Sequence, residues 1–191
     1  MKKIIILLAF VTLQTALFAQ GTWKLDKMHS RLQFTVTHLA VSDVEGNFKD
    51  FDVTITTTKP DFSDAKFELT ANVASINTGV DMRDADLKSD HFFNAAVNPT
   101  LTFVSTDIKK TSENHYKISG DLTMHGITKH VTMDLWYRGT IMNPMSKASD
   151  AGFQLTGVVK RSEFNIGAMY PNAMLSEDVI IKADGEFSIA K

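Results

Sequence analysis

The chain has 191 residues, no cysteine and a formal net charge of −2 at pH 7. The absence of cysteine excludes disulfides, thiolate zinc sites, iron–sulfur clusters and a cysteine nucleophile. Acidic and basic residues are interspersed without a basic stripe, so the charge pattern gives no support for binding to nucleic acid.

The N-terminal segment has the layout of a secretory signal peptide. Two lysines follow the initial methionine, an apolar stretch runs from Ile4 to Phe18, and a small residue follows at Ala19. The apolar stretch is about 15 residues long, whereas a membrane-spanning helix needs ~20. We therefore expect residues 1–19 to be a cleaved signal peptide and residues 20–191 to be a periplasmic or secreted protein without stable membrane insertion. The alternative is a retained membrane anchor.

The rest of the chain alternates between apolar and polar residues with a period of two, which is typical of β-strands with one buried face. In the segment that begins at Ser30, one face carries Leu32, Phe34, Val36 and His38. The same alternation recurs near residues 51–55, 67–73, 101–103, 116–124, 127–135, 153–159 and 181–189. The pattern predicts about eight strands in one all-β domain, without internal repeats or linkers.

Short turn signals separate these segments and favour an antiparallel meander. The predicted turns are Glu45-Gly46-Asn47, Lys59-Pro60-Asp61, Glu113-Asn114, His125-Gly126 and Asp150-Ala151-Gly152. About eight antiparallel strands can close into a barrel and so remove both sheet edges. The alternation alone does not distinguish a barrel from a β-sandwich, and it does not show whether a barrel would be hollow or filled.

One segment, residues 79–92, interrupts the alternation and predicts a short helix. Asp81 is placed to cap its N-terminus, with Met82, Ala85 and Leu87 facing inward. We expect this helix to lie over one open end of the barrel. A second irregular stretch, residues 142–150, is polar and is expected to be a surface loop.

Several motifs occur in an order that resembles the YceI-like family. They are Trp23–Ser30, Val44–Phe48, Asn77–Thr78 with Arg83–Asp84, Phe92–Phe93, Gly120–Thr123 with His125–Gly126, and Arg161–Gly167. The resemblance covers nearly all of the chain after the predicted signal peptide, and residues 168–171 depart from it.

The resemblance implies a lipocalin-like, extended eight-stranded antiparallel barrel that binds a long apolar lipid in its interior. The lipid would be a polyisoprenoid, a prenylated quinone or a fatty amide, with no other cofactor, and the resemblance favours a homodimer. An apolar interior with polar groups at the mouth suits such a ligand. Burial of its tail would contribute roughly 25 cal/mol per Å² before the losses on binding.

The candidate lipid-binding residues are of two kinds. Those expected to contact the apolar tail are Leu32, Phe34, Val36, Phe51, Val53, Phe67, Leu69, Phe103, Ile118, Leu122, Met124, Met133, Phe164 and Ile166. Three polar candidates, His38, Arg83 and Asp84, are expected near the head group, where a guanidinium suits a phosphate or a carbonyl. The structural alternatives are ordinary core packing, a backbone hydrogen bond for His38, and an ion pair between Arg83 and a nearby aspartate.

The sequence contains no nucleophile elbow, zinc-protease motif, P-loop or dinucleotide fingerprint. His29 and Ser30 are strand neighbours and point to opposite faces. His125 and His130 could face each other across a hairpin, but no third metal ligand is evident. We therefore predict a non-enzymatic carrier for transport, storage or stress protection. The alternatives are an enzyme or chaperone that acts on such a lipid through His38, Arg83 and Asp84, or an interaction module with a filled barrel.

Overall fold

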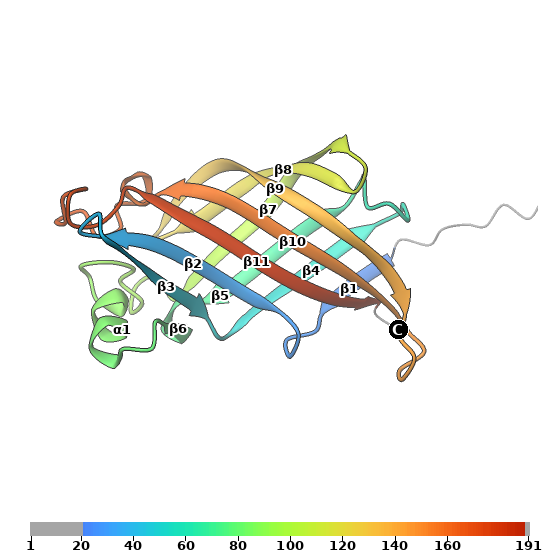
Figure 1. Ribbon diagram of the computed structural model, residues 1–191, viewed down its shortest axis with the longest axis horizontal. Helices are drawn as coiled ribbons and strands as arrows, with labels where there is room; N and C mark the ends of the chain where they lie inside the picture. Colours follow the sequence, from blue (N-terminus) through green and yellow to red (C-terminus); the bar gives the residue numbers. More distant parts are fainter. Residues whose placement is uncertain (1–20, 190–191) are drawn as a thin grey trace, which may run out of the picture.

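Antiparallel strands dominate residues 21–189, which are the residues that the computed structural model describes (Figure 1). The strands are β1 (Gly21–Leu25), β2 (Arg31–His38), β3 (Ser42–Phe48), β4 (Phe51–Thr57), β5 (Lys66–Asn72), β6 (Ile76–Asn77), β7 (Thr100–Ser112), β8 (His115–Met124), β9 (Ile127–Met142), β10 (Ser149–Lys160) and β11 (Asp178–Ile189). The helices are α1 (Asp81–Lys88) and two 3₁₀ turns, η1 (Val73–Ser75) and η2 (Arg161–Phe164). The predicted signal peptide, residues 1–19, lies outside the described residues.

The sheet closes into a barrel because β11 has two successive partners on the same edge. Its residues Ile180–Asp184 pair with β2, and Phe187–Ile189 pair with β1. β1 and β2 therefore form one interrupted row of the barrel. The next row consists of β4, which pairs with β1, and β3, which pairs with β2. The row after that consists of β5, which pairs with β4, and β6, which pairs with β3. The predicted eight-stranded antiparallel barrel is confirmed, and three of its eight rows each consist of two strands.

Two of the predicted turns are wrong. Glu45-Gly46-Asn47 lies inside β3, where Gly46 stands opposite Phe34 on β2. A Cβ atom at Gly46 would lie 2.2 Å from Cζ of Phe34, so this glycine accommodates an aromatic ring and does not make a turn. Asp150-Ala151-Gly152 lies inside β10, and the chain reverses before it, where Asn143 Oδ1 accepts hydrogen bonds from the backbone amides of residues 145 and 146. The other three predicted turns are confirmed.

Helix α1 forms where it was predicted, but it turns a different face inward. Met82 is 84% exposed and Ala85 is also exposed, whereas Asp84 is buried and Leu87 is half-buried. The reason is polar: the Asp84 carboxylate accepts hydrogen bonds from the backbone amide and hydroxyl of Thr78 at 2.8 and 2.6 Å, which fixes the rotation of the helix. The predicted cap is also wrong, because Asp81 is the first helical residue and the N-cap position has no side-chain hydrogen bond.

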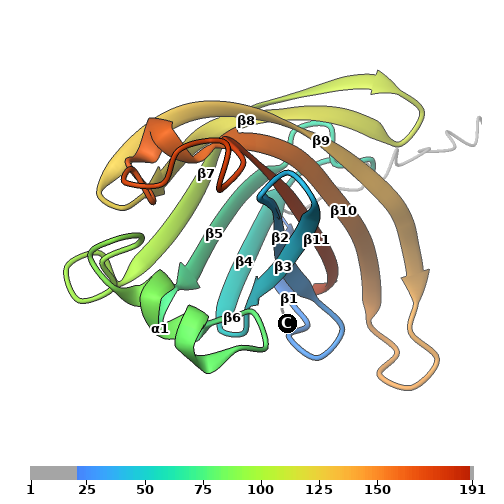
Figure 2. The same cartoon turned by 60° about the vertical axis from the view of Figure 1, so that its left-hand side comes forward.

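The two ends of the barrel differ. Helix α1 and the connection between β10 and β11 lie at one end (Figure 2). At the other end, the buried ring of Phe62, from the loop between β4 and β5, packs against Trp23, Tyr137 and Phe153 with centroid distances of 5.3, 5.0 and 4.9 Å. This aromatic cluster fills that end. No helix among the described residues is long and apolar enough to cross a membrane.

The loop that supplies Phe62 is organised by Asp64. Burial raises the pKa of the Asp64 carboxyl, but hydrogen bonds from the hydroxyls of Thr57 and Thr58 and from the backbone amides of Thr58 and Lys59 outweigh it and lower the pKa to about 2. A carboxyl group whose pKa is lower in the folded state than in the unfolded state stabilises the fold above its unfolded pKa. That contribution is lost as the pH falls through the folded pKa.

We expect Asp64→Asn to lower the free energy of unfolding near neutral pH, because the amide replaces a charged acceptor of four hydrogen bonds. The difference from the wild type should shrink as the pH falls from about 4 to about 2, where the wild-type carboxylate is itself protonated. Urea unfolding followed by circular dichroism at several pH values measures this difference. A difference that does not change with pH would contradict the assigned role of the ionised carboxylate.

Candidate functional site

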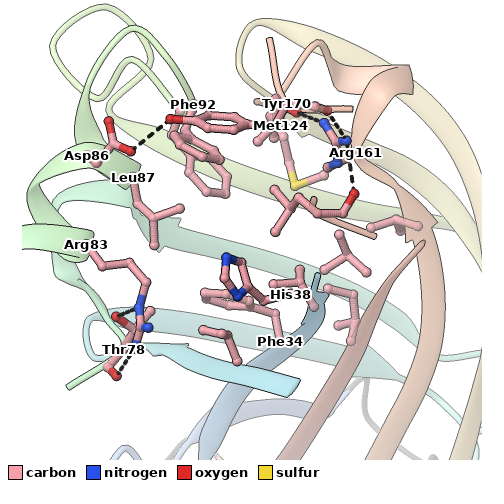
Figure 3. A pocket seen from close by; sticks show the side chains of 18 of the residues that line it. Phe34, His38, Thr78, Arg83, Asp86, Leu87, Phe92, Met124, Arg161 and Tyr170 are labelled. Carbon is pink, nitrogen blue, oxygen red and sulfur yellow. Dashed lines mark hydrogen bonds between the residues drawn. The ribbon is translucent and has the colours of Figure 1, made fainter. Parts of the chain in front are cut away.

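A cavity of about 310 Å³ lies inside the barrel at the end covered by α1 (Figure 3). Its strand residues are almost all apolar. They are Phe34, Val36, His38, Val44, Phe48, Leu101, Met124, Val159, Val179 and Ile181. The volume is at the lower end of the ~300–1,000 Å³ found for small-molecule sites. An apolar cavity of this size favours an apolar ligand.

Aromatic rings form part of the wall of the cavity. The Phe34 ring occupies the space that the absent side chain of Gly46 leaves on the neighbouring strand. Phe34 then packs against Phe48, and Phe48 packs edge-on against Phe93, each pair with ring centroids 6.0 Å apart. These rings cover the backbone of the wall and leave the space beside them free.

Polar groups gather at the mouth of the cavity. Figure 3 shows the His38 ring near the centre, Arg83 on the α1 side and Arg161 on the opposite side. Arg83 donates from Nε to Oγ1 of Thr78 at 2.8 Å and from Nη2 to the carbonyl oxygen of Thr78 at 2.9 Å. Among the described residues its Nη1 group has no hydrogen-bond partner, so these donors remain available to a ligand at the mouth.

Asp84 and Arg83 both form hydrogen bonds with Thr78 but do not form an ion pair with each other. Within residues 21–189 no carboxylate oxygen lies within 4.0 Å of the Arg83 guanidinium. The Asp84 carboxylate bonds to Thr78 and Asn77 and does not line the cavity. Burial raises the Asp84 pKa, but the hydrogen bonds from Thr78 and the charges of Lys88 and Arg83 outweigh burial and lower it, so this carboxyl is ionised. Asp84 therefore positions α1 and Thr78 for Arg83.

Arg161 organises the connection between β10 and β11. It is buried, and its guanidinium donates hydrogen bonds to the carbonyl oxygens of residues 166, 167, 170, 175 and 176 and to Oδ1 of Asn172, at 2.6–3.3 Å. No carboxylate of the described chain pairs with it. Arg161 therefore shapes this connection and leaves a positive charge at the cavity wall.

The connection and α1 touch across the mouth. Tyr170 stacks on Phe92 with ring centroids 5.2 Å apart, and its hydroxyl donates to Oδ2 of Asp86 at 3.5 Å (Figure 3). The end of β2 joins the same connection, since the backbone amide of Leu39 donates to the carbonyl oxygen of Met174 at 2.9 Å. These contacts make a partial cover over the cavity.

The candidate residues from the sequence fall into three groups. Those that line the large cavity are Phe34, Val36, His38, Arg83, Met124 and Ile166. Those that line a second, deeper void of about 70 Å³ are Phe51, Val53, Phe67, Leu69, Phe103 and Ile118. Those that line neither space are Leu32, Asp84, Leu122, Met133 and Phe164, all of which are buried. The barrel is thus hollow in the half near α1 and nearly filled in the other half.

Several lining residues were missed because they lie outside the alternating segments. The main ones are Leu87, Phe92, Phe93, Arg161 and Tyr170. Phe92, Phe93 and Arg161 lie in motifs that carry the family resemblance, and Leu87 was predicted to face inward from the helix, but none of these signals assigns a residue to the cavity. Tyr170 lies in the segment that departs from the resemblance.

The histidines outside the mouth have separate partners. Nδ1 of His125 lies 3.0 Å from the carbonyl oxygen of Phe164, and Nδ1 of His130 lies 3.0 Å from Oδ1 of Asp121. His125 and His130 therefore do not converge on one point. Nδ1 of His29 lies 2.9 Å from a carboxylate oxygen of Asp26.

We expect Gly46→Ala to occlude the cavity, because the added methyl group would meet the Phe34 ring at 2.2 Å and force it inward. Overpacking of this kind lowers the free energy of unfolding by about 1–3 kcal/mol. The cavity space lost to the displaced ring should separately weaken binding of an apolar fluorescent probe, by about tenfold if ~1.4 kcal/mol of apolar burial is lost. Gly152→Ala is the matched control, since a methyl group there would meet only the Cβ atom of Arg138 at an ordinary 3.5 Å. Equal probe binding by both variants would show that Phe34 does not control the cavity.

Comparisons with known proteins agree with this architecture. The family model of the YceI-like domain matches residues 23–187. A UPF0312 protein of Staphylococcus aureus is 39% identical over 170 residues, which cover 87% of this chain and 96% of that protein.

Solved structures share the fold. The YCEI protein of Campylobacter jejuni has a TM-score of 0.75 and 31% identity, and the match covers 81% of this chain and 90% of that structure. A polyisoprenoid binding domain from Saccharophagus degradans, implicated in plant cell wall breakdown, has a TM-score of 0.66 and 16% identity, over 88% of this chain and 98% of that one. The extent of the sequence matches shows that this chain belongs to the YceI-like family.

Proposed function

We propose that this protein is an exported carrier that binds the apolar chain of a long lipid, such as an isoprenoid, inside its barrel. The observation that carries the proposal is the cavity of about 310 Å³, which is apolar along the strands and has polar groups only near its mouth. This arrangement matches an amphiphile whose tail enters the barrel and whose head stays at the opening. The structural likeness to a polyisoprenoid binding domain of Saccharophagus degradans supports the same ligand class.

The groups at the mouth favour a head group that accepts hydrogen bonds. Arg83 offers its Nη1 donors, His38 lies at the centre of the opening, and Arg161 adds a positive charge on the other side. A phosphate or a carbonyl oxygen is the natural acceptor for a guanidinium. The lipid would therefore be a prenyl phosphate, a prenylated quinone or a fatty amide.

A carrier fits the site better than an enzyme does. Of the three polar candidates, Asp84 is turned towards Thr78 and Asn77 and does not line the cavity. Asp86 also lines the cavity, but its carboxylate lies 3.0 Å from Nδ1 of His91 and accepts a hydrogen bond from the Tyr170 hydroxyl. Among the described residues, no carboxylate oxygen lies within 4.0 Å of Arg83 or His38 to complete an acid–base pair. Export to the periplasm or the exterior, a role in transport, storage or stress protection, and assembly as a homodimer remain predictions from the sequence.

The proposal predicts that the protein purifies with a bound lipid. Native mass spectrometry of protein from a bacterial host, followed by organic extraction, should recover a long-chain lipid in a ratio near one per chain. Val36→Glu should abolish this retention, because it places a charge within the apolar lining. Val104→Glu is the matched control, since Val104 is 39% exposed and lies outside the cavity. Ligand-free wild-type protein that also ignores prenylquinones in solution would refute the carrier function.

Arg83 is expected to recognise the head group. Arg83→Gln should weaken binding of farnesyl phosphate by about tenfold or more, because a hydrogen bond to a charged group contributes ~1.5–3 kcal/mol. Binding of farnesol, which has the same tail without the phosphate, should change little. Lys88→Gln removes a charge from the last turn of the same helix and serves as the control. Equal losses for farnesol and farnesyl phosphate would show that Arg83 acts only on the shape of the cavity.

A further inference from the structure

A layer of side chains separates the large cavity from the deeper void. Along β8, Met124 lines the large cavity and Ile118 lines the void, while Leu122 between them lines neither. Along β10, Val159 lines the large cavity and Leu155 lines the void, with Gly157 between them. We define the middle layer as four residues near this level that line neither space: Leu32, Leu122, Met133 and Gly157.

Met133 is the adjustable member of the middle layer. It is 5% exposed and lies on β9, next to Gly157 on the neighbouring β10. A Cβ atom at Gly157 would lie 2.7 Å from Cγ and 3.2 Å from Sδ of Met133, so the thioether chain lies directly on this glycine. Methionine is unbranched and flexible, and a glycine opposite gives it a place against the wall. Met133 and Gly157 therefore pack as one unit in the middle layer.

We propose that Met133, seated on Gly157, sets the length of the apolar tail that the barrel accepts. The proposal rests on the carrier function proposed above and adds that the length of the tail determines which lipids bind. A tail that enters at the mouth fills the large cavity and stops at the middle layer. Carbon atoms beyond that length remain outside and gain nothing from burial. If Met133 is shortened, the large cavity and the void of about 70 Å³ join, and the barrel accepts a longer tail.

The test measures affinity against tail length with one head group. Decanol, dodecanol, tetradecanol, hexadecanol and octadecanol compete with anilinonaphthalene sulfonate for the full-length protein. Affinity for the wild type should rise about fourfold for each added methylene group, as expected for burial of apolar surface, and then level off at one length. Met133→Ala should move this limit to longer alcohols, and Gly157→Ala should move it to shorter ones, because the added methyl group pushes Met133 into the tail.

The double variant Met133→Ala/Gly157→Ala should return the limit towards the wild-type value, since the smaller side chain makes room for the added methyl group. Met142→Ala is the control, because Met142 lies on the same strand but is 65% exposed. Thermal melting followed by circular dichroism establishes that each variant is folded, and Met133→Val provides a milder truncation if Met133→Ala is not.

The outcomes separate this inference from the proposed function. Limits that move in opposite directions for the two single variants support Met133 as the length-determining residue. The same limit in the wild type and in all folded variants would overturn that role while leaving the carrier function intact. Failure of the wild type to bind any alcohol in the series would overturn the carrier function, and the length limit with it.

Discussion

The interior of this protein can be partly empty because the hydrogen-bonded sheet around it closes on itself. β11 pairs first with β2 and then with β1, and this double pairing closes the sheet. In a closed antiparallel barrel the backbone donors and acceptors are satisfied between neighbouring rows, and no edge is left. The inward side chains then have to cover the wall, but they do not have to fill the centre. The cavity depends on this closure, and so does the stability of the fold around it.

The two ends of the barrel differ in where their large aromatic side chains lie. At the closed end Phe62 projects from a loop into the barrel and brings four aromatic rings together. At the open end the Phe34 ring lies on the wall over Gly46. Phenylalanine is thus used as a plug in one half and as wall covering in the other. The difference lies in whether the ring comes from a loop above the axis or from a strand that faces a glycine, since only the second arrangement leaves the axis free.

The strands and the barrel follow from local alternation, which is why they can be predicted from the sequence. The errors arise where a residue serves a partner on another strand or segment. Gly46 lies in a segment whose residue types are typical of a turn. Its role is set instead by Phe34, which becomes its neighbour only when β2 and β3 pair. An aspartate such as Asp84 is expected on the exposed face of a helix. Its hydrogen bonds with Thr78 turn it inward and leave Met82 exposed. Arg161 and Tyr170 lie in segments without alternation, so no periodic signal assigns them to the cavity. For the same reason, the division of the inward residues between two spaces was not visible in their spacing.

The charges at the open end give the cavity a direction. A guanidinium buried without a carboxylate is costly unless other dipoles compensate it, and six oxygen acceptors surround Arg161. Those dipoles stabilise the charge but do not neutralise it, so the cavity wall keeps the positive charge of Arg161. Among the described residues, the one carboxylate that lines the cavity is Asp86, which interacts with Tyr170 and His91. Arg83 adds a second charge on the side of α1, whereas the void beyond the middle layer is lined mainly by apolar side chains. An amphiphile therefore gains from entering tail first and from leaving its acceptor atoms between Arg83 and His38. The same features that hold α1 and the β10–β11 connection in place would thus also orient the proposed ligand in the barrel.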